Sequence, residues 1–253
     1  MKISNGMLLL LLTSSLALSS CKKDEEEEPE PAPAPAAPSN PIPAPSAAFG
    51  ALVAVQTSNY VTVPLIGEIN QPVGVAVGVF GNLLTPAYVN AGTVQVNATA
   101  LTQQSNKTYL YTPAATTPTG IDFNDSVIWS VSGDATTTAP AIDYTVPRNM
   151  PTGPKYSGST TIGRTADFTL NSSVAIADAD SIIYNVISNG KTITRTTAGT
   201  IQSVTFSAAE MGTLTAGGGY VQIVPFNISA QTFSGKQIYF VNESVATKQV
   251  TFN

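Results

Sequence analysis

Apolar and polar residues alternate in many short stretches of the chain after its first 48 residues. In one of them Val127, Trp129 and Val131 fall on one side, and Ser130 and Ser132 fall on the other. A period of two indicates a half-buried β-strand, because successive strand side chains point to opposite faces. No helical periodicity longer than two turns interrupts this pattern. The sequence therefore predicts an all-β fold.

Other alternating stretches have the same character, and turn residues separate them at intervals of roughly ten residues. They cover residues 73–79, 94–96, 109–111 and 250–252. Many short strands at this spacing are typical of a β-sandwich, in which two sheets pack through their apolar faces. We therefore expect a sandwich architecture.

The second half contains sharper local signals. Residues 181–188 and 191–197 flank Asn189-Gly190, and this dipeptide favours a type I′ hairpin turn because both positions tolerate positive φ. A strand at 201–206 leads into Ser207-Ala208-Ala209-Glu210, the pattern of a capping box on a single helical turn. Strands at 220–228 and 237–241 follow. This order resembles the E–F region of immunoglobulin-like domains, and the resemblance implies a fold but no function.

Proline and glycine are dense between residues 147 and 154, which predicts a domain boundary there. We expect two tandem immunoglobulin-like β-sandwich domains, at 47–148 and 155–253, after a disordered Pro-rich tether. Each would have about 100 residues, an ordinary size for such a domain.

The first 20 residues have the features of a secretory signal: Lys2, an apolar run from Met7 to Leu12, and small residues before Ser20. The apolar run is shorter than the roughly 20 residues of a membrane span. Leu18-Ser19-Ser20-Cys21 resembles the bacterial lipobox. This resemblance implies cleavage between Ser20 and Cys21 and acyl chains on Cys21. The alternative is an ordinary signal peptide that contains a cysteine.

Residues 21–46 are read as a tether. Lys22 and Lys23 precede a run of acidic residues, an arrangement similar to the export signal of Bacteroidota surface lipoproteins. The resemblance implies an outer-membrane location facing the cell exterior, and the alternative is a solvated charge run. Eight prolines between Pro29 and Pro45 favour polyproline II, which would extend this segment to about 50 Å.

Composition excludes several kinds of chemistry. The chain has no histidine and one cysteine, so it contains neither a histidine-dependent nucleophile nor an internal disulfide. Charged residues make up 11% of the chain, and six of the sixteen acids lie in the tether. The remainder is nearly neutral and has no basic patch, which argues against nucleic acid as a partner. We predict no cofactor.

Two candidate ligand sites stand out. Trp129, the one tryptophan, could form a stacking platform for a sugar, although its apolar neighbours favour a core position. Asp178 and Asp180 could begin a calcium site, because hard cations prefer clustered oxygen ligands. No turn glycine and no later glutamate complete a known calcium loop, so an exposed acidic turn is the preferred interpretation and no metal site is predicted.

Ser126 and Ser181 are candidate O-glycosylation sites. Each lies in an Asp-Ser-aliphatic triplet, Asp125-Ser126-Val127 and Asp180-Ser181-Ile182. This triplet resembles the acceptor pattern of Bacteroidota secreted proteins.

Three functions remain open at this point. The preferred one is a non-catalytic surface lipoprotein for binding, adhesion or envelope structure, attached to the membrane through its lipid and directed at an extracellular glycan or protein. The second is a carbohydrate-binding accessory of a glycan-uptake system. The third is a hydrolase with paired carboxylates, although the acids of the folded part are scattered along the sequence.

Overall fold

The computed structural model describes residues 48–85 and 87–253, so the predicted signal peptide and the whole predicted tether lie outside the described residues. Strands dominate this part of the chain, and its one helix is α1, with four residues (Ala208–Met211). The all-β prediction is confirmed. No helix within these residues is long and apolar enough to cross a membrane.

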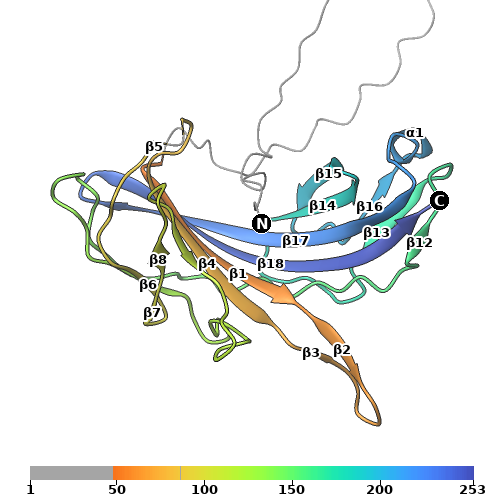
Figure 1. Cartoon of the computed structure of the whole chain (residues 1–253), viewed down its shortest axis with the longest axis horizontal. Helices are drawn as coiled ribbons and strands as arrows, with labels where there is room; N and C mark the ends of the chain where they lie inside the picture. Colours follow the sequence, from red (N-terminus) through yellow and green to blue (C-terminus); the bar gives the residue numbers. More distant parts are fainter. Residues whose placement is uncertain (1–47, 86) are drawn as a thin grey trace, which may run out of the picture. The chain divides into compact units, whose positions relative to one another are not determined.

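A ten-stranded sheet forms the framework (Figure 1). Eight of its strands follow the order β15-β14-β17-β18-β1-β4-β9-β8, while β12 pairs with β18 and β5 pairs with β4. The strands are β1 (Gly50–Ser58), β4 (Val73–Asn82), β5 (Ala87–Tyr88), β8 (Thr102–Gln103), β9 (Tyr109–Tyr111), β12 (Thr161–Ile162), β14 (Ser181–Ser188), β15 (Lys191–Ala198), β17 (Gly217–Phe233) and β18 (Lys236–Phe252).

The first and last long strands of the chain lie side by side in this sheet. β1 pairs with β18 in parallel along its whole length, from Gly50 opposite Ile238 to Ser58 opposite Ala246. On its other edge β1 pairs with β4 in antiparallel fashion. The two predicted domain segments are therefore hydrogen-bonded to each other within one sheet.

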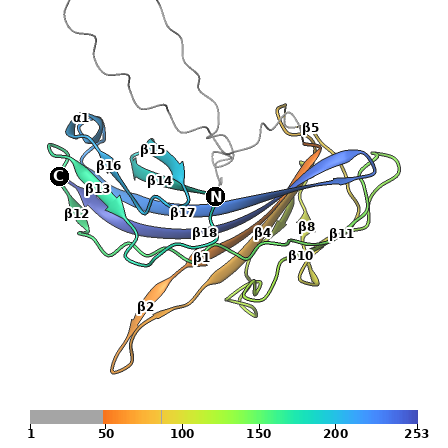
Figure 2. The same cartoon turned by 180° about the vertical axis from the view of Figure 1, so that it is seen from behind.

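A second sheet covers one end of the framework and encloses the first hydrophobic core (Figure 2). It has four strands in the order β11-β10-β6-β7, namely β6 (Val94–Val96), β7 (Thr99–Ala100), β10 (Ile128–Val131) and β11 (Ile142–Thr145). Leu52 and Phe80 from the large sheet share this core with Trp129 and Val131. This packing of two sheets is sandwich-like.

The second core lies at the other end of β17 and β18. Ile182 and Tyr184 of β14 pack there with Val221, Val250 and other residues. Its cover consists of α1 and a two-stranded sheet, β13 (Phe168–Asn171) with β16 (Ser203–Phe206). Another two-stranded sheet, β2 (Tyr60–Val63) with β3 (Gly67–Asn70), pairs with no other strand.

The β17–β18 hairpin contributes to both cores. Ile238 and Phe240 belong to the first core, and Val250 and Phe252 belong to the second. All four have even numbers on one strand, so the two cores lie on the same face of the sheet. The division into tandem immunoglobulin-like domains at 47–148 and 155–253 stays a prediction.

The Pro- and Gly-rich segment 147–154 is held against the sheet between the two cores. Three side chains with 0% exposure, Asn227, Asn242 and Ser244, donate hydrogen bonds to its backbone carbonyls. The acceptors are the carbonyl oxygens of Asn149 (2.8 Å), Arg148 (2.9 Å) and Pro151 (2.6 Å). These bonds satisfy polar groups that would otherwise be costly to bury, so they fix the path of the segment.

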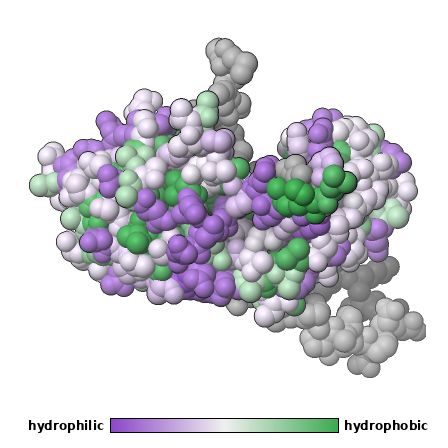
Figure 3. Space-filling model, turned by 90° about the horizontal axis from the view of Figure 1, so that it is seen from below, coloured by the Kyte–Doolittle hydropathy of each residue, from purple (hydrophilic) through white to green (hydrophobic). Residues whose placement is uncertain are grey.

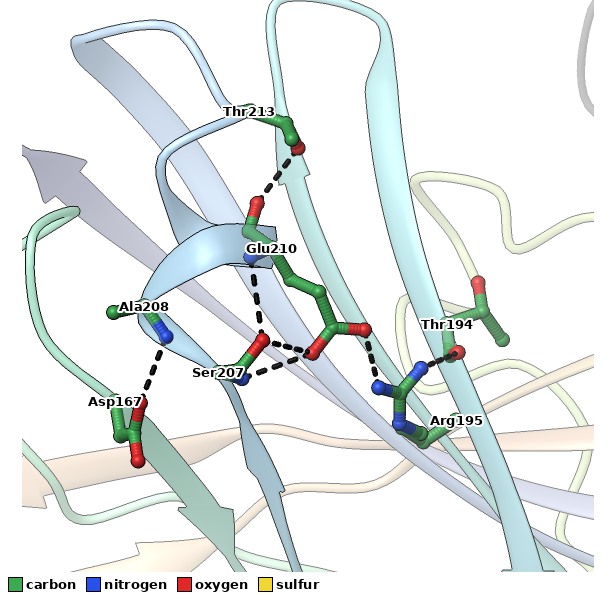
Figure 4. Close-up of polar contacts among 7 residues, drawn as sticks. All are labelled: Asp167, Thr194, Arg195, Ser207, Ala208, Glu210 and Thr213. Atoms are coloured by element: carbon green, nitrogen blue, oxygen red, sulfur yellow. Dashed lines mark hydrogen bonds and ion pairs between the residues drawn. The ribbon is translucent and has the colours of Figure 1, made fainter. Parts of the chain in front are cut away.

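The local predictions for the second half are confirmed. β14 and β15 pair as a hairpin around Asn189 and Gly190, whose φ angles are 46° and 78°. Ser207 caps α1 through both bonds of the capping box with Glu210. Figure 4 shows the capping box of α1 and the ion pair that joins Glu210 to Arg195 of β15.

Candidate functional site

An open cleft rich in amide side chains lies where β1 and β3 end and β4 begins. Its volume is about 670 Å³. We call it the amide cleft. It is lined by Gln56, Asn59, Asn70, Gln71, Pro72, Val73, Pro118, Thr119, Ile121, Asp122 and Asn124.

Two glycines join the walls of this cleft. Gly74 of β4 donates a backbone hydrogen bond to Thr119 O (2.9 Å) and accepts one from Ile121 N (3.1 Å). A Cβ on Gly74 would lie 1.9 Å from Ile121 O, and one on Gly120 would lie 2.0 Å from Gly74 O. Gly120 also has a φ of 68°. Only glycine permits this approach, because any side chain would overlap the facing backbone.

Asn97 holds the loop that carries the far wall. Its side-chain nitrogen donates to Asp122 O (2.7 Å) and to Ser126 O (2.8 Å), while its side-chain oxygen accepts from Ile128 N (2.8 Å). Because one amide satisfies three backbone groups, the loop has a defined path. No pattern in the sequence marks this role, because asparagine is common in β-turns.

The cleft offers neutral donors and acceptors. Gln56, Gln71 and Asn124 have no side-chain hydrogen bond within the described part of the chain, and the last two are exposed. Asp122 is the one acid in the lining, and one of its carboxylate oxygens accepts from Asn124 N (2.9 Å). Amides and a carboxylate pair well with hydroxyl groups, whereas Pro72 and Val73 offer apolar contact.

No protein-family model and no curated protein matches the chain.

Trp129 lies in the first core with 0% exposure, so the structure does not offer it as a stacking platform. It alternates with exposed residues of β10, as the sequence pattern indicated. Its ring nitrogen has no acceptor among the described residues.

Asp178 and Asp180 hold the segment 147–154 in place. Arg148 forms an ion pair with one carboxylate oxygen of Asp180, and Ile228 N donates to the other (3.0 Å). Asp178 accepts a bond from Asn227 through its backbone oxygen (2.7 Å). Within residues 48–85 and 87–253, no three His, Cys, Asp or Glu residues gather as a metal site would require.

The two candidate glycosylation sites differ in access. Ser181 has 0% exposure at the start of β14, so a modifying enzyme cannot reach its hydroxyl in the folded chain. Ser126 is half-buried beside the amide cleft. Modification of Ser126 stays a prediction.

Cys21 and Ser20 lie outside the described residues. The predicted lipidation and cleavage therefore depend on the sequence motif alone.

The polar residues around α1 that Figure 4 shows have a structural role. Asp167 accepts from Ala208 N (2.7 Å), and Glu210 binds both Ser207 and Arg195. The backbone N–H of Ser207 is the main reason that the pKa of Glu210 is below its usual value. These contacts cap α1 and join it to β15, which is a structural role.

Glu243 lies on the face of β18 opposite the two cores, between Val55 and Phe226 on the neighbouring strands. Burial raises its pKa from 4.5 to about 7. A raised pKa means that the folded state binds the proton more tightly than the unfolded state does. The proton on Glu243 therefore stabilises the folded state fully below pH 4.5. This contribution to the free energy of unfolding is lost as the pH rises through about 7.

We therefore expect the free energy of unfolding to fall by at most about 3 kcal/mol between pH 5 and pH 8. Glu243→Gln should flatten this dependence, because the amide does not titrate. Urea unfolding at a series of pH values measures the effect. Glu68→Gln, which changes an exposed ion pair, serves as the control and should leave the slope unchanged. An unaltered slope in Glu243→Gln would assign the pH dependence to other groups.

Proposed function

We propose that this chain is a lipid-anchored, non-catalytic binding protein displayed on the outer membrane. The observation that carries the binding role is the amide cleft, a built site whose donors and acceptors are almost all neutral. Catalysis at neutral pH usually needs a base or a nucleophile of matched pKa, and amides provide neither. Six of the ten acids after residue 47 have roles in the framework, as ion-pair partners, caps or turn acceptors.

Anchoring is proposed on Leu18-Ser19-Ser20-Cys21. Cys21→Ser should abolish incorporation of labelled palmitate and move the protein from the membrane to the soluble fraction. The chain has no other cysteine, so the label has no second thiol to occupy. If the label persisted in Cys21→Ser, the lipidation proposal would be wrong.

The outward orientation needs its own test. Protease added to intact cells should remove the folded part, because a protein on the outer face is accessible. Full protection from the protease would place the folded part on the periplasmic side. It would not change the conclusion about lipidation.

A glycan is the second, more specific candidate ligand. The amide groups of Gln71 and Asn124, next to the carboxylate of Asp122, match the hydroxyl pattern of a sugar. The described lining of the cleft contains no aromatic side chain, so recognition would depend on hydrogen bonds.

A glycan array tests this second candidate. The probe is the chain from residue 21 with Cys21→Ser, so that no lipid interferes. Gln71→Ala and Asn124→Ala should each weaken binding about two- to tenfold, the effect of one lost hydrogen bond. Gln231→Ala, on an exposed part of β17, should bind normally. Silence across the array would exclude the glycan and leave a protein ligand for the same cleft.

We further propose that the two sandwich-like cores unfold together and do not behave as tandem immunoglobulin-like domains. Supporting this, β18 contributes to both cores and pairs with β1.

A further inference from the structure

The β2–β3 hairpin ends in an apolar tip. Leu65 is fully exposed and Ile66 is 73% exposed, more than any other large hydrophobic side chain in the described residues. Figures 1 and 2 both show the hairpin continuing beyond the large sheet, and Figure 3 views the molecule from the side toward which it projects. Exposed aliphatic side chains gathered at a projecting point indicate a contact surface.

The backbone at this tip is also unfavourable for the residue that occupies it. Leu65 has a φ of 69°, in the left-handed region that glycine and asparagine adopt far more readily. Folding alone would therefore favour a small or polar residue at this position. A leucine that is both exposed and in an unfavourable conformation indicates a role other than stabilising the fold.

The base of the hairpin is fixed, so the tip is presented in a defined direction. The Tyr60 hydroxyl donates to Gly153 O (3.4 Å). Lys155 forms an ion pair with Glu68, and its ammonium lies 5.1 Å from the centre of the Tyr60 ring.

A second cleft, which we call the apolar cleft, lies at the opposite end of β1. It has a volume of about 560 Å³, and its lining includes Phe49, Leu83, Leu84 and Val89. Leu84 is 52% exposed there. Lys236 lies at its edge, with its ammonium 4.6 Å from the centre of the Phe49 ring.

The tip and the apolar cleft cannot meet within one chain. Leu65 follows Phe49 by sixteen positions of mostly extended backbone, which at about 3.3 Å per residue places them roughly 50 Å apart. A second copy of the chain brings both surfaces at once.

We propose that the apolar tip of one copy inserts into the apolar cleft of the next, so that copies join head to tail. The turn residues Pro64, Leu65 and Ile66 carry no charge, so insertion buries no ion. The ammonium of Lys236 can donate to the carbonyl oxygens of the incoming turn. Because the two surfaces differ, an assembly of any length keeps one free tip at one end and one free cleft at the other, so it grows as an open chain.

Assembly of this kind depends neither on the amide cleft nor on lipidation. Attachment to one membrane would favour head-to-tail association, because tethered copies meet at a high effective concentration.

Sedimentation velocity tests the proposal on the chain from residue 21 with Cys21→Ser. The average mass should rise over a roughly hundredfold range of concentration. A tip variant, Leu65→Asn with Ile66→Thr, should stay monomeric, and asparagine also suits the positive φ. A cleft variant, Leu84→Asn, should stay monomeric as well. Ile201→Thr, which changes another exposed aliphatic residue, is the control and should associate normally.

Mixing the two variants gives the decisive result. The tip variant keeps its cleft and the cleft variant keeps its tip, so together they should form a one-to-one pair that cannot extend. Emission from Trp129 confirms that each variant is folded.

Three outcomes would overturn the proposal. The first is a monomer at every concentration, and the second is a closed dimer that Leu84→Asn leaves intact, which would indicate tip-to-tip contact. The third is a chain that stays monomeric yet binds vesicles of phosphatidylethanolamine and phosphatidylglycerol through its tip. That result would assign the tip to a membrane.

Discussion

Residues 47–148 expressed alone are expected to remain unfolded, although they contain most of the first hydrophobic core. Without β18 they lose Ile238 and Phe240, which have 0% exposure in that core. They also lose the strand that pairs with β1 along nine residues, which leaves one edge of β1 without partners. Loss of two large core side chains alone costs about 4 to 10 kcal/mol, comparable to the stability of a whole domain.

Trp129 makes this result easy to measure. It is the one tryptophan of the chain and is buried in the first core, so its emission reports on that core alone. Emission should be red-shifted in 47–148 and blue-shifted in residues 47–253, which serve as the control. A blue-shifted emission with cooperative unfolding in 47–148 would show instead that the first core folds alone, as the tandem-domain prediction has it.

Features determined by neighbouring residues could be predicted from the sequence. The hairpin around Asn189-Gly190 follows from the positive φ angles of its turn, and the cap of α1 follows from Ser207 and Glu210. The alternation through Trp129 likewise indicated which side chains of β10 face inward. Each signal is contained within about ten residues, so tertiary contacts have little opportunity to override it.

Pairing between distant strands had no such signal. β1 and β18 are parallel partners almost 190 positions apart, and parallel pairing leaves no turn in the sequence to mark it. The segment 147–154 has the composition of a linker, yet Asn227, Asn242 and Ser244 bind it from strands far along the chain. Asparagine within a buried strand is unusual, so Asn227 and Asn242 were the available sign that polar side chains bind another segment there.

The amide cleft was missed for a related reason. Its lining comes from two segments, residues 56–73 and 118–124, that are polar and ordinary when considered separately. The pairing of Gly74 with Gly120 brings them together. The sequence candidates Trp129, Asp178 and Asp180 instead have structural roles. Trp129 belongs to the first core, and the two aspartates hold the segment 147–154.

Gly74→Ala is therefore expected to damage both the fold and the cleft. The added Cβ would lie 1.9 Å from Ile121 O and 2.8 Å from the carbon that bears it. Backbone atoms cannot rotate away as a side chain can, so β4 and the 118–124 loop must separate. Both hydrogen bonds between them would break, and Ile121, which is 5% exposed, would leave the first core. We expect a loss of at least about 3 kcal/mol in the free energy of unfolding.

Gly218→Ala is the matched control for this change. Gly218 also lies in a long strand, β17, but a Cβ there meets nothing within 4 Å and its φ is not positive. The free energy of unfolding of the Gly218→Ala variant should be unchanged or slightly raised, because alanine restricts the unfolded chain. Urea unfolding followed by Trp129 emission compares the two variants. Equal stability would show that the loop moves aside at little cost, and the walls of the amide cleft would then not be fixed by this contact.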